Sequence, residues 1–301
     1  MSKIGFGKIS LIFFIAGLWQ LVIAGESGEL SERKLLTSPP AALVLQTNHL
    51  QLTPKGTLQV QTAFEFRSDW QAPITHARGD LYRLGVMRFD FGLADHVTLQ
   101  IRGAIRQELR CAKKTLADGA ATAHDVGDFS VATLARLLPA GKFHPALGFR
   151  IETKLPNTNQ DRGIGTNTTD VTMSVLATKQ YGSALVFTDV GIGILTAPRQ
   201  INDQNDVMVY GLGVLWKISN QFQIAGEING FTSPRQQIPV GTEDRSAARL
   251  GVNWRLPKFS LELLAVNGLT RREGGLGFIA GLSWQVNMFS TAVIQSNQQN
   301  R

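Results

Sequence analysis

Polar and apolar residues alternate one by one in segments of this chain, most cleanly from Leu147 to Leu155. Apolar side chains at most of the odd positions there alternate with Arg150, Glu152 and Lys154 at the even ones. Successive side chains of a β-strand point to opposite faces. Three charges on one face are difficult to bury in a soluble sandwich, since each unpaired buried charge is costly. The pattern is typical of a membrane barrel, with apolar side chains toward lipid and polar ones toward a wet lumen.

Similar runs predict about twelve antiparallel strands of roughly ten residues each. The connections between them alternate in length, and short turns separate the long polar ones at 68–80, 107–127, 157–169, 197–205, 231–245 and 267–274. Barrels of bacterial outer membranes alternate in this way because tight turns face the periplasm and longer loops face the outside. The chain therefore predicts an all-β transmembrane antiparallel β-barrel over residues 57–286.

The N-terminus has the features of a secretory signal peptide. Lys3 and Lys8 are followed by an apolar run from Ile9 to Ala24, which ends in small residues before a polar stretch. We expect cleavage after Ala24, so that residues 1–24 are removed on export. The alternative is an uncleaved anchor helix, but a run of roughly 16 apolar residues is shorter than the ~20 that span a bilayer. The predicted location is the outer membrane of a Gram-negative cell.

Two further segments flank the predicted barrel. Residues 25–56 are irregular, since Pro39-Pro40 breaks any regular element. This segment could plug the lumen, lie in the periplasm or begin the first strand, and its sequence favours none of the three. Residues 287–301 form a polar tail rich in Gln and Asn, which we interpret as a short periplasmic extension.

Composition excludes several other functions. The formal charge of +7 is compatible with nucleic-acid binding, but an exported chain without a basic block does not meet nucleic acid. Cys111 is the only cysteine, so no internal disulfide can form. The five histidines are scattered through loops and turns without ligand spacing, so we predict no metal site and no cofactor.

Charged side chains on the polar faces of the strands are the main functional feature. We predict that they line the lumen: Arg67, Arg102, Arg106, Arg136, Arg150, Glu152, Lys154, Asp189, Lys217, Glu227, Arg249, Arg255 and Glu262. A lumen with excess positive charge favours anionic solutes. The alternative is a salt-bridged, filled lumen that only stabilises the barrel. An eight-stranded barrel is filled by side chains and one of sixteen strands leaves a wide channel, so twelve strands favour a narrow pore.

The last predicted strand, Gly277 to Val286, has an apolar face and a small or polar face. Its residues Gly281, Trp284 and Val286 resemble the last-strand signal that the barrel-assembly machinery recognises in outer-membrane proteins. The partners expected for the chain are therefore this machinery, outer-membrane lipid and a small-molecule solute.

Several short motifs resemble those of a known family, notably Gly127-Asp128-Phe129-Ser130, Glu152-Thr153-Lys154-Leu155-Pro156 and Gly163-Ile164-Gly165-Thr166 followed by Asp170. The chain resembles the Gram-negative outer-membrane barrels named as transporters of the meta-pathway of phenol degradation. The resemblance covers roughly Leu58 to Val286. Family chains usually end at the aromatic residue of the last strand, whereas this chain continues to Arg301. The resemblance implies an outer-membrane location and uptake of small solutes, aromatic compounds among them.

Three function classes follow from these observations. We expect an outer-membrane channel or transporter for passive uptake of small solutes, aromatic or anionic ones included. The alternative is a structural or adhesive barrel that acts through its outer loops. We expect no enzyme, since a barrel hydrolase needs a Ser or Asp placed with a His at its rim. His76 and His124, with aspartates nearby in the long loops, are the residues on which an enzymatic site would depend.

Overall fold

The computed structural model describes residues 45–111, 121–198 and 203–288, which belong to one compact unit, Ser38–Arg301. The predicted signal peptide, residues 25–44 and the tail from residue 289 lie outside the described residues. The described chain forms these elements: β1 Thr57–Gln71, β2 Arg78–Ala94, β3 Val97–Cys111, β4 Thr122–Asp125, β5 Ser130–Leu138, β6 Ala146–Lys154, η1 Gln160–Arg162 (a short 3-10 helix), β7 Asp170–Tyr181, β8 Ala184–Thr196, β9 Gln204–Lys217, β10 Phe222–Thr232, β11 Arg245–Arg255, β12 Phe259–Gly268 and β13 Leu276–Asn287.

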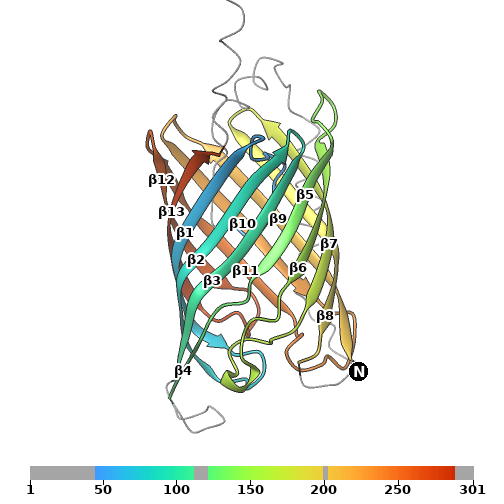
Figure 1. Ribbon diagram of the computed structural model, residues 1–301, viewed down its shortest axis with the longest axis vertical. Helices are drawn as coiled ribbons and strands as arrows, with labels where there is room; N and C mark the ends of the chain where they lie inside the picture. The colour runs from blue at the N-terminus through green and yellow to red at the C-terminus, as the bar shows by residue number, and fades with distance from the viewer. Residues whose placement is uncertain (1–44, 112–120, 199–202, 289–301) are drawn as a thin grey trace, which may run out of the picture. The chain divides into compact units, whose positions relative to one another are not determined.

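The strands form one antiparallel sheet that closes on itself. β1 pairs with β2 on one side and with β13 on the other, from Thr57 opposite Asn287 to Arg67 opposite Gly277. Figure 1 shows this closure where β1 (blue) lies beside β13 (red). β4 and β5 both pair with β3, at different heights, and together occupy one position in the wall. The predicted all-β barrel of twelve strands is therefore confirmed.

The outside of the barrel is apolar. Ile151, Val175 and Leu250 point outward and are 42%, 60% and 64% exposed, whereas the neighbouring inward residue Arg150 is buried. A barrel with an apolar exterior and a polar interior is the arrangement of transmembrane β-barrels. Closure pairs each strand on both sides except β4, which pairs with β3 alone, so nearly all of the wall satisfies its backbone without water. Among the described residues, no helix is long and apolar enough to cross a membrane.

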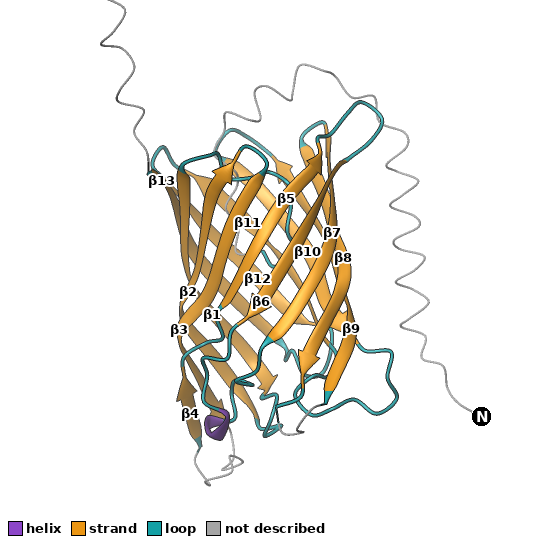
Figure 2. Ribbon diagram, turned by 45° about the vertical axis from the view of Figure 1, so that its right-hand side comes forward, coloured by secondary structure: helices purple, strands orange, loops and turns teal. Residues whose placement is uncertain are grey.

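The connections divide the barrel into two ends. Short turns follow β2, β5, β7, β9 and β11, and we call this the turn end. The loop end is the opposite one, where the chain runs on from β1, β3, β6, β8, β10 and β12. Figure 2 shows the short helix η1 (purple) beside β4 at the loop end.

A shared bulge corrects two sequence predictions. β2 and β3 contain an extra residue relative to β1 near Gly85, whose φ is +60°. The alternation of side chains reverses there, because an extra residue shifts the following side chains to the other face. Arg83, which the sequence places outside, therefore faces the lumen and pairs with Glu65 at 2.9 Å. Arg106, which we predicted to line the lumen, is instead exposed and pairs with Glu108 at 3.4 Å.

Candidate functional site in the barrel lumen

Residues 45–53, which we call the plug segment, lie inside the barrel. The backbone amides of Gln46 and Thr47 donate to the two carboxylate oxygens of Glu227 on β10, at 3.0 and 2.8 Å. Further toward the turn end, the Thr53 amide donates to Oγ1 of Thr98 on β3, at 3.2 Å. Glu227 and Thr98 are buried on the inner wall. The segment is thus held by wall side chains on strands far apart in the barrel, and it is not paired as a strand of the sheet.

Glycines in the wall make room for the plug segment. A Cβ atom at Gly211 on β9 would lie 2.6 Å from Cγ2 of Thr47. One at Gly148 on β6 would lie 2.4 Å from Cδ2 of Leu50. Real Cβ contacts are longer than this, so a side chain at either position would displace the segment. The wall is therefore shaped to the chain that occupies it.

The side chain of Asn48 bridges two opposite charges across the lumen. Its backbone N and its Nδ2 donate to Oδ2 of Asp189 on β8, at 3.2 and 3.4 Å. Its Oδ1 accepts a hydrogen bond from Nη2 of Arg102 on β3, at 2.5 Å. One neutral amide therefore stands between a carboxylate and a guanidinium, and it ties the plug segment to β3 and β8 together.

The charge on Arg102 has no carboxylate partner among the described residues. It hydrogen-bonds only through Nη2, to Asn48 and weakly to Gln100, and its buried Nε has no partner in the described chain. Arg88 lies directly opposite it on β2 and is already paired with Asp90 at 2.8 Å. Like charges directly opposite one another destabilise a strand pair.

A second arginine near Arg102 is already neutralised. Arg150 on β6 forms an ion pair with Glu152 of the same strand, and its Nε donates to Oε1 of Gln100 at 3.2 Å. Gln100 also accepts from Arg102, so the two arginines share this acceptor. Arg88 and Arg150 thus each contact a carboxylate directly, whereas Arg102 reaches Asp189 only through the amide of Asn48.

Part of the lumen is apolar. The buried residues Leu45, Ala63, Leu185, Phe187, Leu215, Ala225, Ala247, Leu264, Val266 and Ile279 form one cluster. Leu45 belongs to the plug segment, and the others lie on the wall. The ring of His49 also meets Phe187 edge-on, with 5.4 Å between ring centroids. The plug segment is therefore held by apolar packing as well as by polar contacts.

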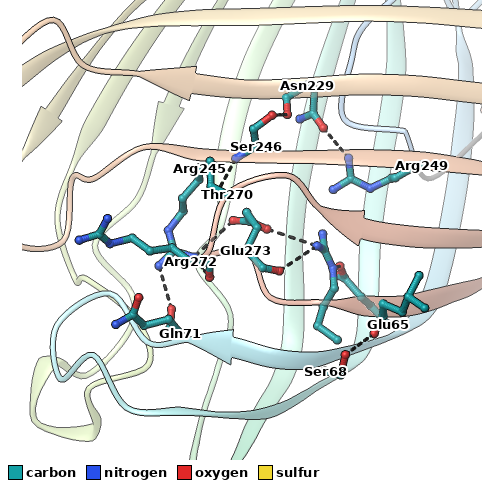
Figure 3. Close-up of polar contacts among 12 residues, drawn as sticks. Glu65, Ser68, Gln71, Asn229, Arg245, Ser246, Arg249, Thr270, Arg272 and Glu273 are labelled. Atoms are coloured by element: carbon teal, nitrogen blue, oxygen red, sulfur yellow. Dashed lines mark hydrogen bonds and ion pairs between the residues drawn. The ribbon is translucent and has the colours of Figure 1, made fainter. Parts of the chain in front are cut away.

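Charged side chains gather in the lumen toward the loop end, where Figure 3 shows Glu65, Arg245 and Glu273. Arg67 pairs with Glu65 at 2.8 Å and with Glu273 at 3.3 Å. Arg245 pairs with the other oxygen of Glu273, also at 3.3 Å. Burial by itself raises the pKa of the Glu273 carboxyl, but Arg245 and Arg67 outweigh it, so that pKa lies below its usual value. The network joins β1 and β11 through the loop between β12 and β13.

The loops pack inward at this end of the barrel. Ile164, in the loop between β6 and β7, is buried with Trp70, Ala72 and Leu81 in a second apolar cluster. The guanidinium of Arg245 lies 5.1 Å from the ring centre of Trp70. Such a cation–π contact adds to the packing. The loop end is thus covered by chain, and the turn end is entered by the plug segment.

The wall between β4 and β5 is interrupted, and a loop side chain fills the break. Oδ1 of Asn157 accepts from the Phe129 amide, and its Nδ2 donates to the Gly127 carbonyl, both at 2.9 Å. The amide of Asn159 donates to Asp125 at 2.7 Å. These contacts take the place of a strand ladder in this part of the wall.

The remaining residues predicted to line the lumen fall into two groups. The buried ones on the inner wall are Arg67, Arg150, Asp189, Glu227, Arg249 and Glu262, with Arg102 and Glu152 partly buried. Lys154, Arg136, Lys217 and Arg255 lie near the ends of their strands. Lys154 pairs with Asp170 at 2.5 Å and Arg136 donates to the Asp95 carbonyl. Lining of a conducting path by these residues stays a prediction, as does the assembly signal at Gly281, Trp284 and Val286.

Sequence reasoning missed the partners inside the lumen. The sequence predicts no role for Asn48. It also predicts none for Thr178, whose Oγ1 accepts from the Leu50 amide at 3.0 Å. Asn48 stands in the polar run Gln46-Thr47-Asn48-His49, so no local signal distinguished it. Within the described ranges, no group of three or more His, Cys, Asp or Glu residues could hold a metal ion.

Comparison with family models and with curated proteins gives no match. The resemblance to the phenol-pathway transporters therefore stays a prediction. Among solved structures, the NanC porin aligns with a TM-score of 0.49 and 9% identity, over 76% of this chain and 100% of that one. The translocator domain of autotransporter NalP from Neisseria meningitidis aligns with a TM-score of 0.47 and 10% identity, over 78% and 90%. Similarities this weak say nothing about function, and the fold assignment rests on the strand pairing itself.

Proposed function

We propose that the chain is an outer-membrane channel for passive uptake of small solutes, closed in this conformation by its plug segment. The observation that carries the proposal is how residues 45–53 are held. Their backbone amides bind side chains of the wall, such as Glu227 and Thr98, rather than a neighbouring strand. Water can replace such acceptors one at a time, so the segment can leave without breaking the sheet.

The size of the barrel supports the same function. Eight strands enclose an interior that side chains fill, and wider barrels leave a channel or hold a plug. Here twelve positions enclose a separate piece of chain, against which the wall is shaped at Gly148 and Gly211. Location in an outer membrane belongs to this proposal, supported by the apolar exterior and the alternation of loops and turns.

Ion current across a planar bilayer tests the proposal. We expect the full mature chain to conduct rarely and a variant that lacks residues 45–53 to conduct steadily. Both proteins must first show the heat-shifted gel mobility of a folded barrel. A folded deletion variant whose current equals that of bare lipid would exclude a channel.

The second candidate function is a filled barrel that binds a partner through its loops. The buried loop residues Ile164 and Ala72 favour it, because they give the loop end a fixed surface. This function predicts silence in the bilayer for both proteins, and it requires loss of partner binding when the loop 155–169 is replaced by a short linker.

A further inference from the structure

We infer that Arg102 is a binding site for a carboxylate-bearing solute, and that the solute opens the channel by taking the place of Asn48. The inference rests on the proposed function and names its solute class and its regulation. It follows from one contact: the neutral amide oxygen of Asn48 occupies the guanidinium of Arg102.

Arg102 is the arginine in this region that contacts no carboxylate directly, since Asn48 stands between it and Asp189. Arg88 and Arg150 beside it are paired with Asp90 and Glu152 on their own strands. Arg102 makes no ion pair with any described residue, and its Nε is buried without a partner. A largely desolvated charge without a directly bonded counter-charge is unfavourable, so an anion that contacts it gains more than at an exposed arginine.

A carboxylate fits this position better than the amide that fills it. The bond from the Arg102 guanidinium to an amide oxygen is charge-assisted on the donor side alone, and a carboxylate adds a full opposite charge to it. The planar guanidinium also offers Nε beside Nη2, and a carboxylate can accept from both at once. Asn48 provides one oxygen, and that oxygen contacts Nη2 alone. The plug segment therefore holds the site with a weaker substitute for the solute.

Loss of this contact weakens the whole plug segment. Asn48 ties the segment to β3 through Arg102 and to β8 through Asp189. Once a carboxylate takes Arg102, Asn48 keeps only its bonds to Asp189, and the two negative groups face each other across it. Binding of the solute and release of the segment are thus coupled, as a ligand that prefers the open state requires.

The test uses acetate as the probe and acetamide, its neutral isostere, as the matched control. Residue 47 is changed to cysteine (T47C) in a full chain that also carries C111A, because Thr47 is buried against the wall. The labelling rate with a membrane-impermeant thiol reagent then reports release of the plug segment without needing a current. At constant ionic strength we expect acetate to raise that rate about fivefold to tenfold, and acetamide to leave it unchanged.

Two variants distinguish binding of acetate at Arg102 from a general electrostatic attraction of anions to the protein. R102A should label faster than the parent without any probe, because the contact with Asn48 is gone, and acetate should add nothing. K258Q removes an exposed charge from the turn between β11 and β12, at the turn end, and should keep the full response to acetate. An acetate response that survives in R102A, or that acetamide reproduces, overturns the inference.

The outcomes also separate this inference from the proposed function. If acetate speeds labelling but the chain without residues 45–53 never conducts, the site stands and the channel does not. If that deletion conducts but acetate changes neither labelling nor current, the channel stands and the site at Arg102 does not.

Discussion

Asn157 acts as a substitute for a strand residue at the break between β4 and β5. Its side-chain amide both accepts from the Phe129 amide and donates to the Gly127 carbonyl, as a neighbouring backbone would. One exposed residue thus satisfies two backbone groups in this part of the wall.

Asn157→Ala should therefore destabilise the barrel by about 0.5–1.5 kcal/mol, because it removes the hydrogen bonds to a backbone N–H and a carbonyl at a site that water reaches. Unfolding of the protein by urea in detergent, monitored by gel mobility, measures this change in the free energy of unfolding. Asn220→Ala, at an exposed position in the turn between β9 and β10, is the control for shortening an amide. Equal stability of the Asn157 variant and the parent would show that water replaces the amide.

The lowered pKa of Glu273, at the loop end, predicts how the stability of the folded barrel depends on pH. Its pKa is lower in the folded barrel than in the unfolded chain, because Arg245 and Arg67 hold the charged form against the effect of burial. Its contribution is fully present above the unfolded value of about 4.3 and is lost as the pH falls through the folded value. We expect the unfolding temperature to fall below about pH 4.3, and to fall less steeply in Glu273→Gln. Parallel curves for the two proteins would contradict this.

At the scale of elements, the alternation of residues predicted most strands. It predicted the wrong face of the wall where a bulge adds a residue and interrupts the two-residue period of the strand. Arg83 and Arg106 lie on either side of the bulge near Gly85, and each therefore faces the side opposite to the predicted one. No local pattern announces such a bulge, because a glycine in a strand is also compatible with regular pairing. The break between β4 and β5 was also missed, because the sequence pattern predicts a loop over residues 107–127.

The fit between wall and plug segment yields a prediction for a single strand, β9. In Gly211→Ala the new Cβ would lie 2.6 Å from Thr47 and 2.8 Å from Oδ1 of Asp189. The plug segment is the part that can move, so we expect a higher bilayer current than for the parent. Gly226→Ala on β10 is the control, since its Cβ would have no neighbour closer than 3.6 Å. Equal currents for the two variants would argue that the segment adapts without leaving.

At the scale of the whole molecule, sequence reasoning reached the closed barrel but not the content of its lumen. The barrel could be predicted because many short segments alternate apolar and polar residues, and each such segment predicts a strand. The contacts of the plug segment join residues 45 to 181 positions apart in the chain, from Thr53 with Thr98 to Gln46 with Glu227. Such pairs depend on the register of all the strands between them. The sequence therefore could not decide among three positions for residues 25–56: in the lumen, in the periplasm or at the start of the first strand.

The plug segment stays covalently attached to the wall it closes. Pro54 to Gly56 join it directly to β1, and the Gly56 amide is fixed to the Gly92 carbonyl at 2.8 Å. A tethered ligand of this kind faces its site at an effective concentration in the millimolar range. In the proposed channel, closure is therefore independent of how much protein the membrane holds, because each molecule carries its own plug segment. A free peptide with the sequence of residues 45–53 would need millimolar amounts to silence the deletion variant, whereas the attached copy needs none.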